Sequence, residues 1–460
     1  MRTICVVGTG YVGLVSGACL ADFGNAVVCV DINQERIDTL RSGKVPFYEP
    51  ALQELVARNT ERGRLSFSTE LAFAIKSSET IFICVGTPSL PTGEVDMSFV
   101  FSAAESIGRY MEDYKIIVNK STVPVGTGVK VAEVIGGMRT ELDFDIVSNP
   151  EFLREGSAID DFMHPDRLVI GASSRRALEA MVDVYRPLYQ NDVPMVLTDI
   201  ESAEMIKYAS NALLASKISF INEIAGICEA FGADVGAVAR GMGLDERIGP
   251  RSLSAGAGYG GSCFPKDVTG LAATAASRGI DTPVIGAIDR SNVLQRQRMI
   301  AKLRDLVESF SNRTICILGL SFKPDTDDVR EAPALEMISA LLAEGAAVHA
   351  YDPVANDRAR EQFSDLVCFE DPYQAAAGAD AVVLMTEWNE FRNIDLPRIL
   401  AAVATPPRFL DCRNIYDPRE MQDLGFEYVS IGRPRLLPGE PPQEDVSTWA
   451  LSSRFSSLRS

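Results

Sequence analysis

Histidine is scarce in this sequence, long apolar runs are missing, and positive charge is outnumbered. There are only two histidines, His164 beside a proline and His349 inside a predicted strand, so acid–base chemistry falls to carboxylates, lysine, ordered water or a thiol. Lysine and arginine number 44 against 63 aspartates and glutamates, a net charge of -19. This balance argues against broad electrostatic binding to nucleic acid or to an acidic membrane. An anionic ligand would need a locally positive site.

No stretch of the chain has the roughly 18 continuous apolar residues of a membrane span. The amino terminus carries one arginine and an apolar run, but four glycines interrupt that run and a strand pattern follows, which argues against a signal peptide. The nine cysteines are odd in number and lie mostly in apolar runs. A disulfide framework is therefore not expected, and the reducing cytoplasm is the predicted compartment. We expect neither a nucleic-acid partner nor a membrane partner.

At 460 residues, with 46% hydrophobic and 23% charged residues, the chain is predicted to be globular with two or three domains. In the first part of the chain, short β-branched runs alternate with helical segments, as in TICVV, AVVCVD, IFICVG, KIIVNKS and DRLVIG. This alternation predicts crossover units and a mostly parallel sheet. From residue 199, ESAEMIKYASNALLASKISFINEIAGICEAFG has few helix breakers and predicts one long helix, of the kind that forms a spine and a dimer surface.

The segment RTICILGLSF (313–322) echoes RTICVVGTGY (2–11). A helix pattern and two further strand patterns follow it, so the carboxy-terminal third is predicted to be a second α/β domain of related architecture. The expected fold is α/β, with two Rossmann-like doubly wound domains joined by a long central helix and a helical dimerisation region. The expected boundaries are 1–198, 199–310 and 311–432, followed by a tail at 433–460 that is rich in Pro, Ser and charge and is predicted to be flexible.

A G-x-G-x-x-G pattern follows the first strand and opens a helix; its glycines are Gly8, Gly10 and Gly13. Asp31 ends the next strand. The glycines allow a tight turn and close approach of a pyrophosphate to the helix amino terminus, and the acid can take ribose hydroxyls. Asp31 would repel a ribose phosphate, which favours NAD over NADP, although Arg36 nearby weakens that preference. The alternative is a glycine-rich turn without a ligand.

Polar clusters follow other strands of the predicted sheet. They are Thr87 in VGTP, residues 120–122 in KSTVP and residues 149–155 in NPEFLRE. Because ligands of open parallel sheets lie beyond the carboxyl ends of the strands, these clusters are predicted to share one site. Alternatively, they are turn residues chosen for capping and loop geometry.

The stretch GYGGSCFPKD (258–267) places Cys263 among glycines, a serine and two charges. A thiol becomes a nucleophile where positive charge or helix amides stabilise its thiolate, and Lys266 and Asp267 lie close by in sequence. Beside a cofactor site, the sulfur of an exposed cysteine can add to an aldehyde. The thiohemiacetal that forms can lose a hydride to become a thioester, and water then releases a carboxylate. The alternative is a structural thiol.

A tetrahedral oxyanion on that path needs hydrogen-bond donors. Lys207 and Asn211 are four residues apart on the predicted long helix and hence on one face. An inward-facing pair could supply the donors, whereas an exposed polar stripe is the alternative reading.

With these residues in view, the chain resembles the nucleotide-sugar 6-dehydrogenases over roughly residues 1–432. The matching signatures, in order, are GTGYVGLV (8–15), VGTP (85–88), KSTVPVGT (120–127), NPEFLREGSAIDDF (149–162), HPDRLVIG (164–171), GYGGSCFPKD (258–267), FKPDTDDVRE (322–331) and TEWNEF (386–391). The resemblance implies oxidation of the C6 alcohol of a sugar nucleotide to a carboxylate in two NAD-dependent steps, without a metal.

The resemblance also implies roles for individual residues. The expected catalytic residues are Cys263 as nucleophile, Lys207, Asn211 and Asp267 for protons and the oxyanion, and Thr122 and Glu151 for water and proton transfer. The expected cofactor contacts are Gly8, Gly10, Gly13, Asp31, Arg36, Thr87, Thr122, Glu155, Lys266 and Arg330. The expected substrate contacts are Glu151, Phe152, Leu153, Lys207, Asn211, Gly260, Lys323 and Arg247, the last of which reaches across a homodimer.

Local lysines and arginines would let an acidic protein hold a diphosphate. By resemblance, the HPDR and TEWNEF stretches favour UDP-glucose as the substrate, with GDP-mannose or a UDP-N-acetylhexosamine as alternatives. Ser252 stands where many relatives have an aromatic residue near the base, which leaves base recognition open. A non-catalytic NAD-binding protein would need Cys263, Lys207 and Asp267 all to be idle. A simple hydroxyacid dehydrogenase would have no use for the thiol.

Overall fold

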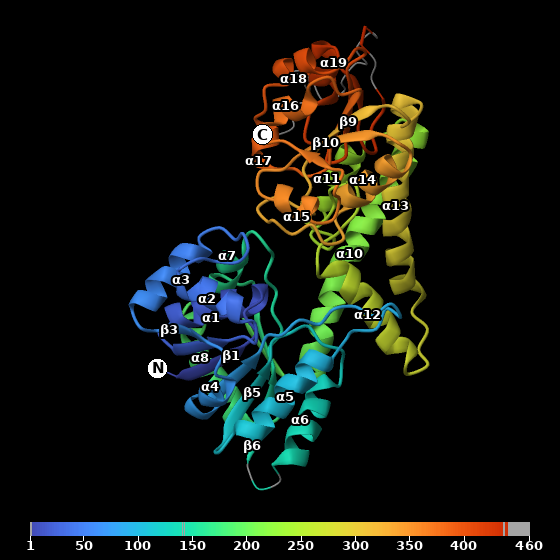
Figure 1. Ribbon diagram of the computed structural model, residues 1–460. Helices are drawn as coiled ribbons and strands as arrows, with labels where there is room; N and C mark the ends of the chain where they lie inside the picture. Colours follow the sequence, from blue (N-terminus) through green and yellow to red (C-terminus); the bar gives the residue numbers. More distant parts are fainter. Residues whose placement is uncertain (1, 140, 142, 436–437, 440–460) are drawn as a thin grey trace, which may run out of the picture.

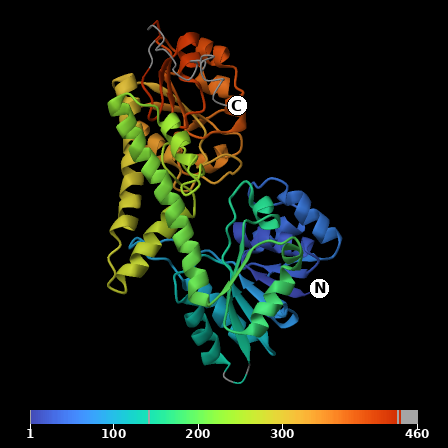
Figure 2. The same ribbon diagram turned by 180° about the vertical axis from the view of Figure 1, so that it is seen from behind.

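A computed structural model describes the protein at residues 2–139, 141, 143–435 and 438–439. Two α/β lobes lie at the two ends of a pair of long helices, α10 (Ile200–Phe231) and α13 (Pro283–Val307) (Figure 1). Seen from behind, α10 runs from the amino-terminal lobe to the carboxy-terminal lobe (Figure 2). Most of the tail predicted to be flexible, 433–460, lies outside the described residues.

The amino-terminal lobe is built on a sheet whose strand order, within the described residues, is β3-β2-β1-β4-β5-β6-β7-β8. Neighbouring strands are parallel except for β6 and β7, which confirms the predicted mostly parallel sheet. The strands are β1 (Thr3–Val7), β2 (Ala26–Val30), β3 (Leu65–Ser68), β4 (Thr80–Ile83), β5 (Lys115–Asn119), β6 (Phe144–Ser148), β7 (Leu168–Ala172) and β8 (Met195–Thr198).

Helices cover both faces of this sheet, which explains why its strands read as continuous apolar runs. Ile4 and Val6 of β1 pack into the apolar cluster on one face, and Cys5 and Val7 pack into the cluster on the other. The helices of this lobe are α1 (Tyr11–Asp22), α2 (Gln34–Arg41), α3 (Leu52–Glu61), α4 (Leu71–Ser77), α5 (Ser98–Tyr110), α6 (Thr127–Met138), α7 (Ala158–Met163), α8 (Arg175–Val184) and α9 (Arg186–Gln190).

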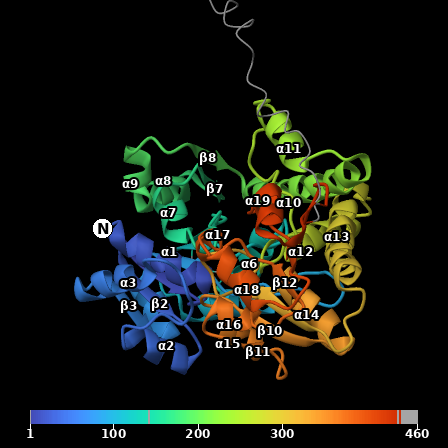
Figure 3. The same cartoon turned by 90° about the horizontal axis from the view of Figure 1, so that it is seen from above.

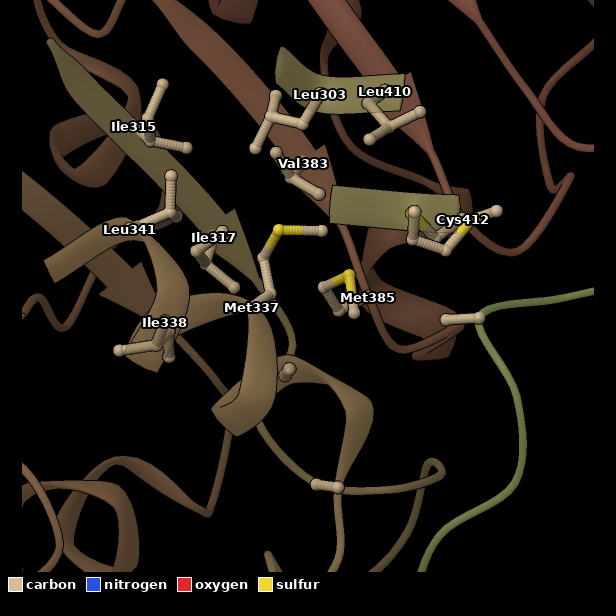
Figure 4. Packing of buried hydrophobic residues seen from close by; sticks show 14 of the residues in the cluster. Leu303, Ile315, Ile317, Met337, Ile338, Leu341, Val383, Met385, Leu410 and Cys412 are labelled. Atoms are coloured by element: carbon tan, nitrogen blue, oxygen red, sulfur yellow. The ribbon is translucent and has the colours of Figure 1, made fainter. Parts of the chain in front are cut away.

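The carboxy-terminal lobe repeats this plan, as the sequence echo predicts. In the described residues its parallel sheet has the order β11-β10-β9-β12-β13-β14, which corresponds to β3-β2-β1-β4-β5-β6 of the first sheet. Figure 4 shows Ile315 and Ile317 of β9 packed with Met337 and Leu341 of α14. The elements are β9 (Thr314–Leu318), α14 (Pro333–Ala343), β10 (Ala347–Tyr351), α15 (Asn356–Arg360), β11 (Val367–Cys368), α16 (Pro372–Ala376), β12 (Ala381–Leu384), α17 (Asn389–Arg392), α18 (Leu396–Ala402), β13 (Arg408–Asp411), α19 (Pro418–Leu424) and β14 (Glu427–Val429).

The central helices confirm the predicted long helix. Asp199 caps α10 by accepting the Ser202 N–H at 2.7 Å, and Gly232, at φ +71°, ends it. α11 (Val235–Gly243) follows, and α12 (Phe264–Ala276) packs against α10 and α13. From above, α13 lies on the side of the molecule away from α1 to α3 (Figure 3). Over the part of the chain that is described, no helix is both long and apolar enough to cross a membrane.

Candidate active site

The turn between β1 and α1 is rich in glycine, and two of its glycines pack so closely on the protein that a side chain would not fit. Gly8 has φ +99°, and a Cβ on it would lie 2.7 Å from the Cys84 carbonyl oxygen. A Cβ on Gly13 would lie 2.0 Å from the Gly8 carbonyl oxygen. By contrast, a Cβ on Gly10 would meet no atom within 4 Å. The turn therefore has an open face at the amino terminus of α1, where backbone N–H groups suit a pyrophosphate.

Asp31 follows β2 and lies beside this turn. Its Oδ2 accepts the Thr9 N–H and hydroxyl, both at 2.8 Å, and its Oδ1 accepts the Asn33 N–H at 3.0 Å. Burial works against the charge, but these donors hold the pKa of Asp31 below its ordinary value. Arg36 Nη1 lies 3.5 Å from Oδ2, so the carboxylate engages the arginine. An ionised carboxylate at this position can accept hydrogen bonds from the hydroxyls of an unphosphorylated ribose.

Cys263 immediately precedes α12, at the amino end of that helix. The structure differs from the exposed, charge-stabilised thiol that the sequence suggests. Burial and the nearby Glu151 raise the pKa of the thiol to about 11, although Lys207 opposes the rise. Lys266 does not stabilise the sulfur, because its Nζ lies 2.5 Å from Asp267 Oδ1. The thiol is therefore protonated at neutral pH and has to lose its proton as it attacks.

Lys207 and Asn211 both point inward, with exposures of 4% and 5%, which excludes the exposed polar stripe. Lys207 Nζ lies 3.0 Å from Glu151 Oε1. Asn211 Nδ2 donates to Asp267 Oδ2 at 2.6 Å. Burial opposes the charge of Lys207, but Glu151 and Cys263 raise its pKa above the ordinary value. The cluster thus holds a buried cation that acts on the Cys263 thiol, and an amide bonded to Asp267, whose charge also acts on that thiol.

Phe152 and Leu153 belong to the segment that follows β6. The Leu153 N–H donates to Glu151 Oε2 at 2.6 Å, which orients that carboxylate. The centroid of the Phe152 ring lies 5.3 Å from Lys207 Nζ and 3.5 Å from the guanidinium carbon of Arg167. Sequence reasoning noted the HPDR stretch but assigned no role to Arg167, because stacking on an aromatic ring leaves no local pattern.

Glu155 joins this segment to the carboxy-terminal lobe. Its Oε1 accepts the Ser262 hydroxyl and its Oε2 accepts the Thr326 hydroxyl, each at 3.1 Å. Arg330 Nη2 lies 3.7 Å from Oε1. Burial and the negative charge of Asp328 raise the pKa of Glu155 to about 7. The structure therefore brings Glu155 and Arg330, both predicted cofactor contacts, together beside the cysteine loop.

The glycine loop before the cysteine packs closely on the carboxy-terminal lobe. A Cβ on Gly260 would lie 2.2 Å from the Glu331 carbonyl oxygen. Gly261 has φ +82°, and a Cβ on it would lie 2.8 Å from the Phe322 ring. Lys323, which follows Phe322, is half-buried, and burial lowers its pKa. Glycine is therefore required in this loop, and a lysine lies next to the contact.

Thr87 and Thr122 follow the adjacent strands β4 and β5, at the same edge of the sheet. Thr122 lies in the loop before α6. Glu204 of α10 holds that loop in place, because its carboxylate accepts the Gly126 N–H at 2.7 Å and the Gly128 N–H at 2.8 Å. Sequence reasoning missed Glu204, and only its place on the long helix could have pointed to it.

Arg247 is the predicted site residue that the chain does not bring to this cluster. Its side chain is 89% exposed, and Nη2 pairs with Asp245 Oδ2 at 2.5 Å. Its predicted role depends on a second subunit.

Comparison with known proteins gives a consistent result. The UDP-glucose/GDP-mannose dehydrogenase family matches the chain in three parts: its NAD binding domain at residues 2–189, its central domain at 201–293 and its UDP binding domain at 316–418. A curated UDP-glucose 6-dehydrogenase of Rhizobium meliloti is 49% identical over 439 residues, which cover 94% of this chain and 99% of that protein. UDP-glucose 6-dehydrogenase TuaD of Bacillus subtilis is 48% identical over 443 residues, 96% of this chain and 95% of that protein.

Solved structures agree. A UDP-glucose dehydrogenase from the archaeon Pyrobaculum islandicum has a TM-score of 0.86 and 37% identity, and the match covers 91% of this chain and 96% of that one. The predicted fold and the predicted NAD cofactor are confirmed. The glycine turn and Asp31 lie in the matched NAD binding domain, and Cys263 lies in the matched central domain. The chain belongs to the UDP-glucose/GDP-mannose dehydrogenase family and is an NAD-dependent oxidoreductase.

Proposed function

We propose that the protein oxidises UDP-glucose to UDP-glucuronate, using two NAD and one water for each substrate. The observation that carries this proposal is the cluster of Cys263, Lys207 and Asn211, a thiol close to a buried cation and an amide. A thiol suits a second oxidation, because the thiohemiacetal it forms with an aldehyde can lose a hydride to become a thioester. The curated relatives at 48% and 49% identity are UDP-glucose 6-dehydrogenases, which supports the choice of substrate.

NAD, when bound, accepts the hydride in each of the two oxidations. The open turn at Gly10 and the carboxylate of Asp31 beside it, whose pKa is held below its ordinary value, support its assignment to the amino-terminal lobe. The contacts proposed for it are Gly8, Gly10, Gly13, Asp31, Arg36, Thr87, Thr122, Glu155, Lys266 and Arg330.

Lys207 and Asn211 are assigned to donate hydrogen bonds to the oxygen on the sugar C6. The sulfur of Cys263 bonds to C6 of the aldehyde while the thiol proton passes to the C6 oxygen, which gives a thiohemiacetal. Since the pKa of this thiol is raised to about 11, a cation and an amide at the developing alkoxide lower the barrier. The thiohemiacetal then loses a hydride from C6 to the cofactor and its hydroxyl proton to solvent water, which leaves a thioester on Cys263.

Hydrolysis of the thioester needs an oriented water. Glu151 and Thr122 are assigned to this role, because Glu151 is a buried carboxylate fixed by Lys207 at 3.0 Å. Water adds to the thioester carbonyl, the bond from carbon to sulfur breaks, and the thiol regains its proton as the carboxylate leaves. Asp267 is assigned to position Asn211, to which it is hydrogen-bonded at 2.6 Å.

The UDP part of the substrate is assigned to the carboxy-terminal lobe, with Lys323 near the diphosphate. A cavity of about 370 Å³ supports this assignment, because four arginines line it: Arg240, Arg392, Arg413 and Arg433. Arg413 Nη2 also donates to the carbonyl of Phe322, next to Lys323, at 3.0 Å. Clustered arginines provide the local positive potential that an anionic ligand needs on an acidic protein.

A homodimer through α10 is part of the proposal. The exposed apolar side chains of this helix are Met205, Leu213, Leu214, Phe220, Ile227 and Phe231. Exposed apolar side chains gathered on one element are typical of a subunit contact. In such a dimer, the exposed Arg247 would reach the neighbouring substrate site. Light scattering that finds only monomer at assay concentrations would contradict this part.

The proposed domains follow the two sheets and the helices between them, with divisions at 1–198, 199–310 and 311–432. All nine cysteines lie in the described residues and are free of disulfides there. Free cysteines support a reducing compartment, the cytoplasm.

The deciding experiment counts NADH formed per sugar nucleotide consumed, with excess NAD. Two NADH per UDP-glucose would support the four-electron path, and one would show that the reaction stops at the aldehyde. GDP-mannose and UDP-N-acetylglucosamine are assayed in parallel, because a UDP-D-ManNAc dehydrogenase from Pyrococcus horikoshii shares this fold at a TM-score of 0.83 and 26% identity. Turnover of one of these in preference to UDP-glucose would replace the proposed substrate.

The same assay tests the nucleophile. Cys263→Ser is expected to lower turnover roughly 10³-fold or more while leaving NADH affinity within about two-fold. Cys368→Ser is the matched control, because Cys368 is also half-buried and lies on β11 in the carboxy-terminal lobe. Full activity in the Cys263 variant would rule out the thioester path.

A further inference from the structure

Glu49, a carboxylate outside the catalytic cluster, links two loops of the site. It lies just before α3, and the residue is 7% exposed. Its Oε2 accepts the Tyr11 hydroxyl and also the Gly156 N–H, the latter at 2.6 Å. Its Oε1 accepts the Ala158 N–H at 2.8 Å. One buried carboxylate therefore holds a side chain from one loop and two backbone groups from another.

The partners of Glu49 belong to the two loops with assigned ligands. Tyr11 is the first residue of α1, directly after the glycine turn, and its ring packs on Phe47 with centroids 5.1 Å apart. Gly156 directly follows Glu155 in the catalytic segment, residues 151–158, which also carries Glu151. Ser157, the residue that precedes α7, makes no capping bond with its side chain. Glu49 therefore accepts the Ala158 N–H at the start of α7, and it shares the Gly156 N–H with the Tyr11 hydroxyl, which lies 3.1 Å from that nitrogen.

The loop that carries Glu49 and the segment that carries Gly156 both touch the carboxy-terminal lobe. The Tyr48 N–H donates to Asp327 Oδ1 at 3.2 Å, and Arg358 Nε lies 3.3 Å from Asp327 Oδ2. Gly156 has φ +81°, and a Cβ on it would lie 2.6 Å from the Asp325 carbonyl oxygen. A displacement of the loop that carries Glu49 would therefore disturb both the contact between the lobes and the catalytic segment.

We propose that Glu49 is a positioning residue that couples the dinucleotide site to the sugar-nucleotide site through Tyr11 and Gly156. A ligand on the glycine turn holds the first turn of α1 and thus the Tyr11 hydroxyl. Through its hydrogen bonds, Glu49 then also holds the 151–158 segment in place, and with it the contact of that segment with the carboxy-terminal lobe. Each ligand then tightens the binding of the other by the same factor, since coupling between sites is reciprocal. The inference rests on the proposed function for the identity of the second ligand.

The test is calorimetric titration of UDP into the full-length protein, with and without saturating NADH. The unaltered protein is expected to bind UDP about five-fold or more tightly when NADH is present. Tyr11→Phe keeps the ring on Phe47 but removes the hydroxyl, and it is expected to bring this ratio close to one. Glu49→Gln, which keeps the shape of the side chain, is expected to do the same.

Tyr114→Phe is the matched control. It removes a Tyr114 hydroxyl bond to Asp145 Oδ2 at 2.5 Å in the same lobe, at the end of β6 opposite the site, and it is expected to keep the ratio of the unaltered protein. Thermal unfolding midpoints show that each variant is folded. A ratio that survives in Tyr11→Phe, or that disappears equally in Tyr114→Phe, would overturn the coupling role. A failure of the unaltered protein to oxidise UDP-glucose would instead contradict the proposed function.

Discussion

The two α/β lobes start from one plan and support different sites. In each, a glycine with positive φ follows the first strand and donates its N–H to the last carbonyl of the second, at 2.8 Å for both Gly8 and Gly319. In each, an aspartate follows the second strand, Asp31 in one lobe and Asp352 in the other. The echo between residues 2–11 and 313–322 therefore corresponds to a real structural repeat.

The two aspartates differ in what surrounds them. Asp31 lies beside an open turn, whereas Asp352 is 1% exposed. Asp352 accepts the Leu320 N–H at 2.8 Å and the Trp388 indole N–H at 3.1 Å. The indole thus lies on Asp352, whereas in the amino-terminal lobe Arg36 lies beside the corresponding carboxylate of Asp31. The two lobes therefore share a topology but differ in what closes over the aspartate after the second strand.

The structure that follows the glycine also differs between the two lobes. α1 begins almost at once after Gly8, whereas a long loop separates Gly319 from α14. That loop places Thr326 and Arg330 beside Glu155 and also carries Lys323. Where the first lobe has a helix amino terminus close after its glycine, the second lobe therefore has a loop with polar side chains.

The largest expected effect comes from removing the two aspartates in turn. Asp352→Ala leaves several buried N–H groups without an acceptor and is expected to cost about 3–5 kcal/mol of stability. Asp31→Ala is expected to cost only about 1 kcal/mol but to weaken NADH binding roughly 10- to 100-fold, because it removes a charged acceptor. Thermal unfolding and calorimetric NADH titration measure the two effects. The comparison fails if both variants lose stability and NADH affinity alike.

Two glycines of the dinucleotide turn sharpen the comparison. Gly13→Ala would force a Cβ to within 2.0 Å of a backbone oxygen, and it is expected to cost about 1–3 kcal/mol of stability by overpacking. Gly10 has φ -68° and no neighbour near its Cβ position. Gly10→Ala is expected to leave the unfolding midpoint unchanged or slightly higher and still to weaken NADH binding. Normal NADH affinity in Gly10→Ala would show that the dinucleotide does not use this face.

Local pattern made much of this predictable. The glycine turn, the apolar strands and α10 each depend on spacing within a short stretch. What sequence reasoning missed comes from distant segments: Glu204 holds a loop that belongs to α6, and Trp388 closes the carboxylate of Asp352. The raised pKa of Cys263 was not predicted for the same reason. The burial of this thiol depends on segments from the whole fold, which the spacing of one motif does not show.

A smaller effect is expected where the two lobes meet, at Glu155. Burial and Asp328 raise its pKa to about 7 from an ordinary value of 4.5. The folded protein therefore binds this proton more tightly than the unfolded chain does, so stability is lost as pH rises through that interval. Glu155→Gln cannot titrate. The stability of the unaltered protein relative to this variant should fall by on the order of 1–2 kcal/mol between pH 5 and pH 8, read from thermal unfolding. A difference that stays constant would mean that Glu155 is ionised throughout, with Arg330 outweighing burial at the contact between the lobes.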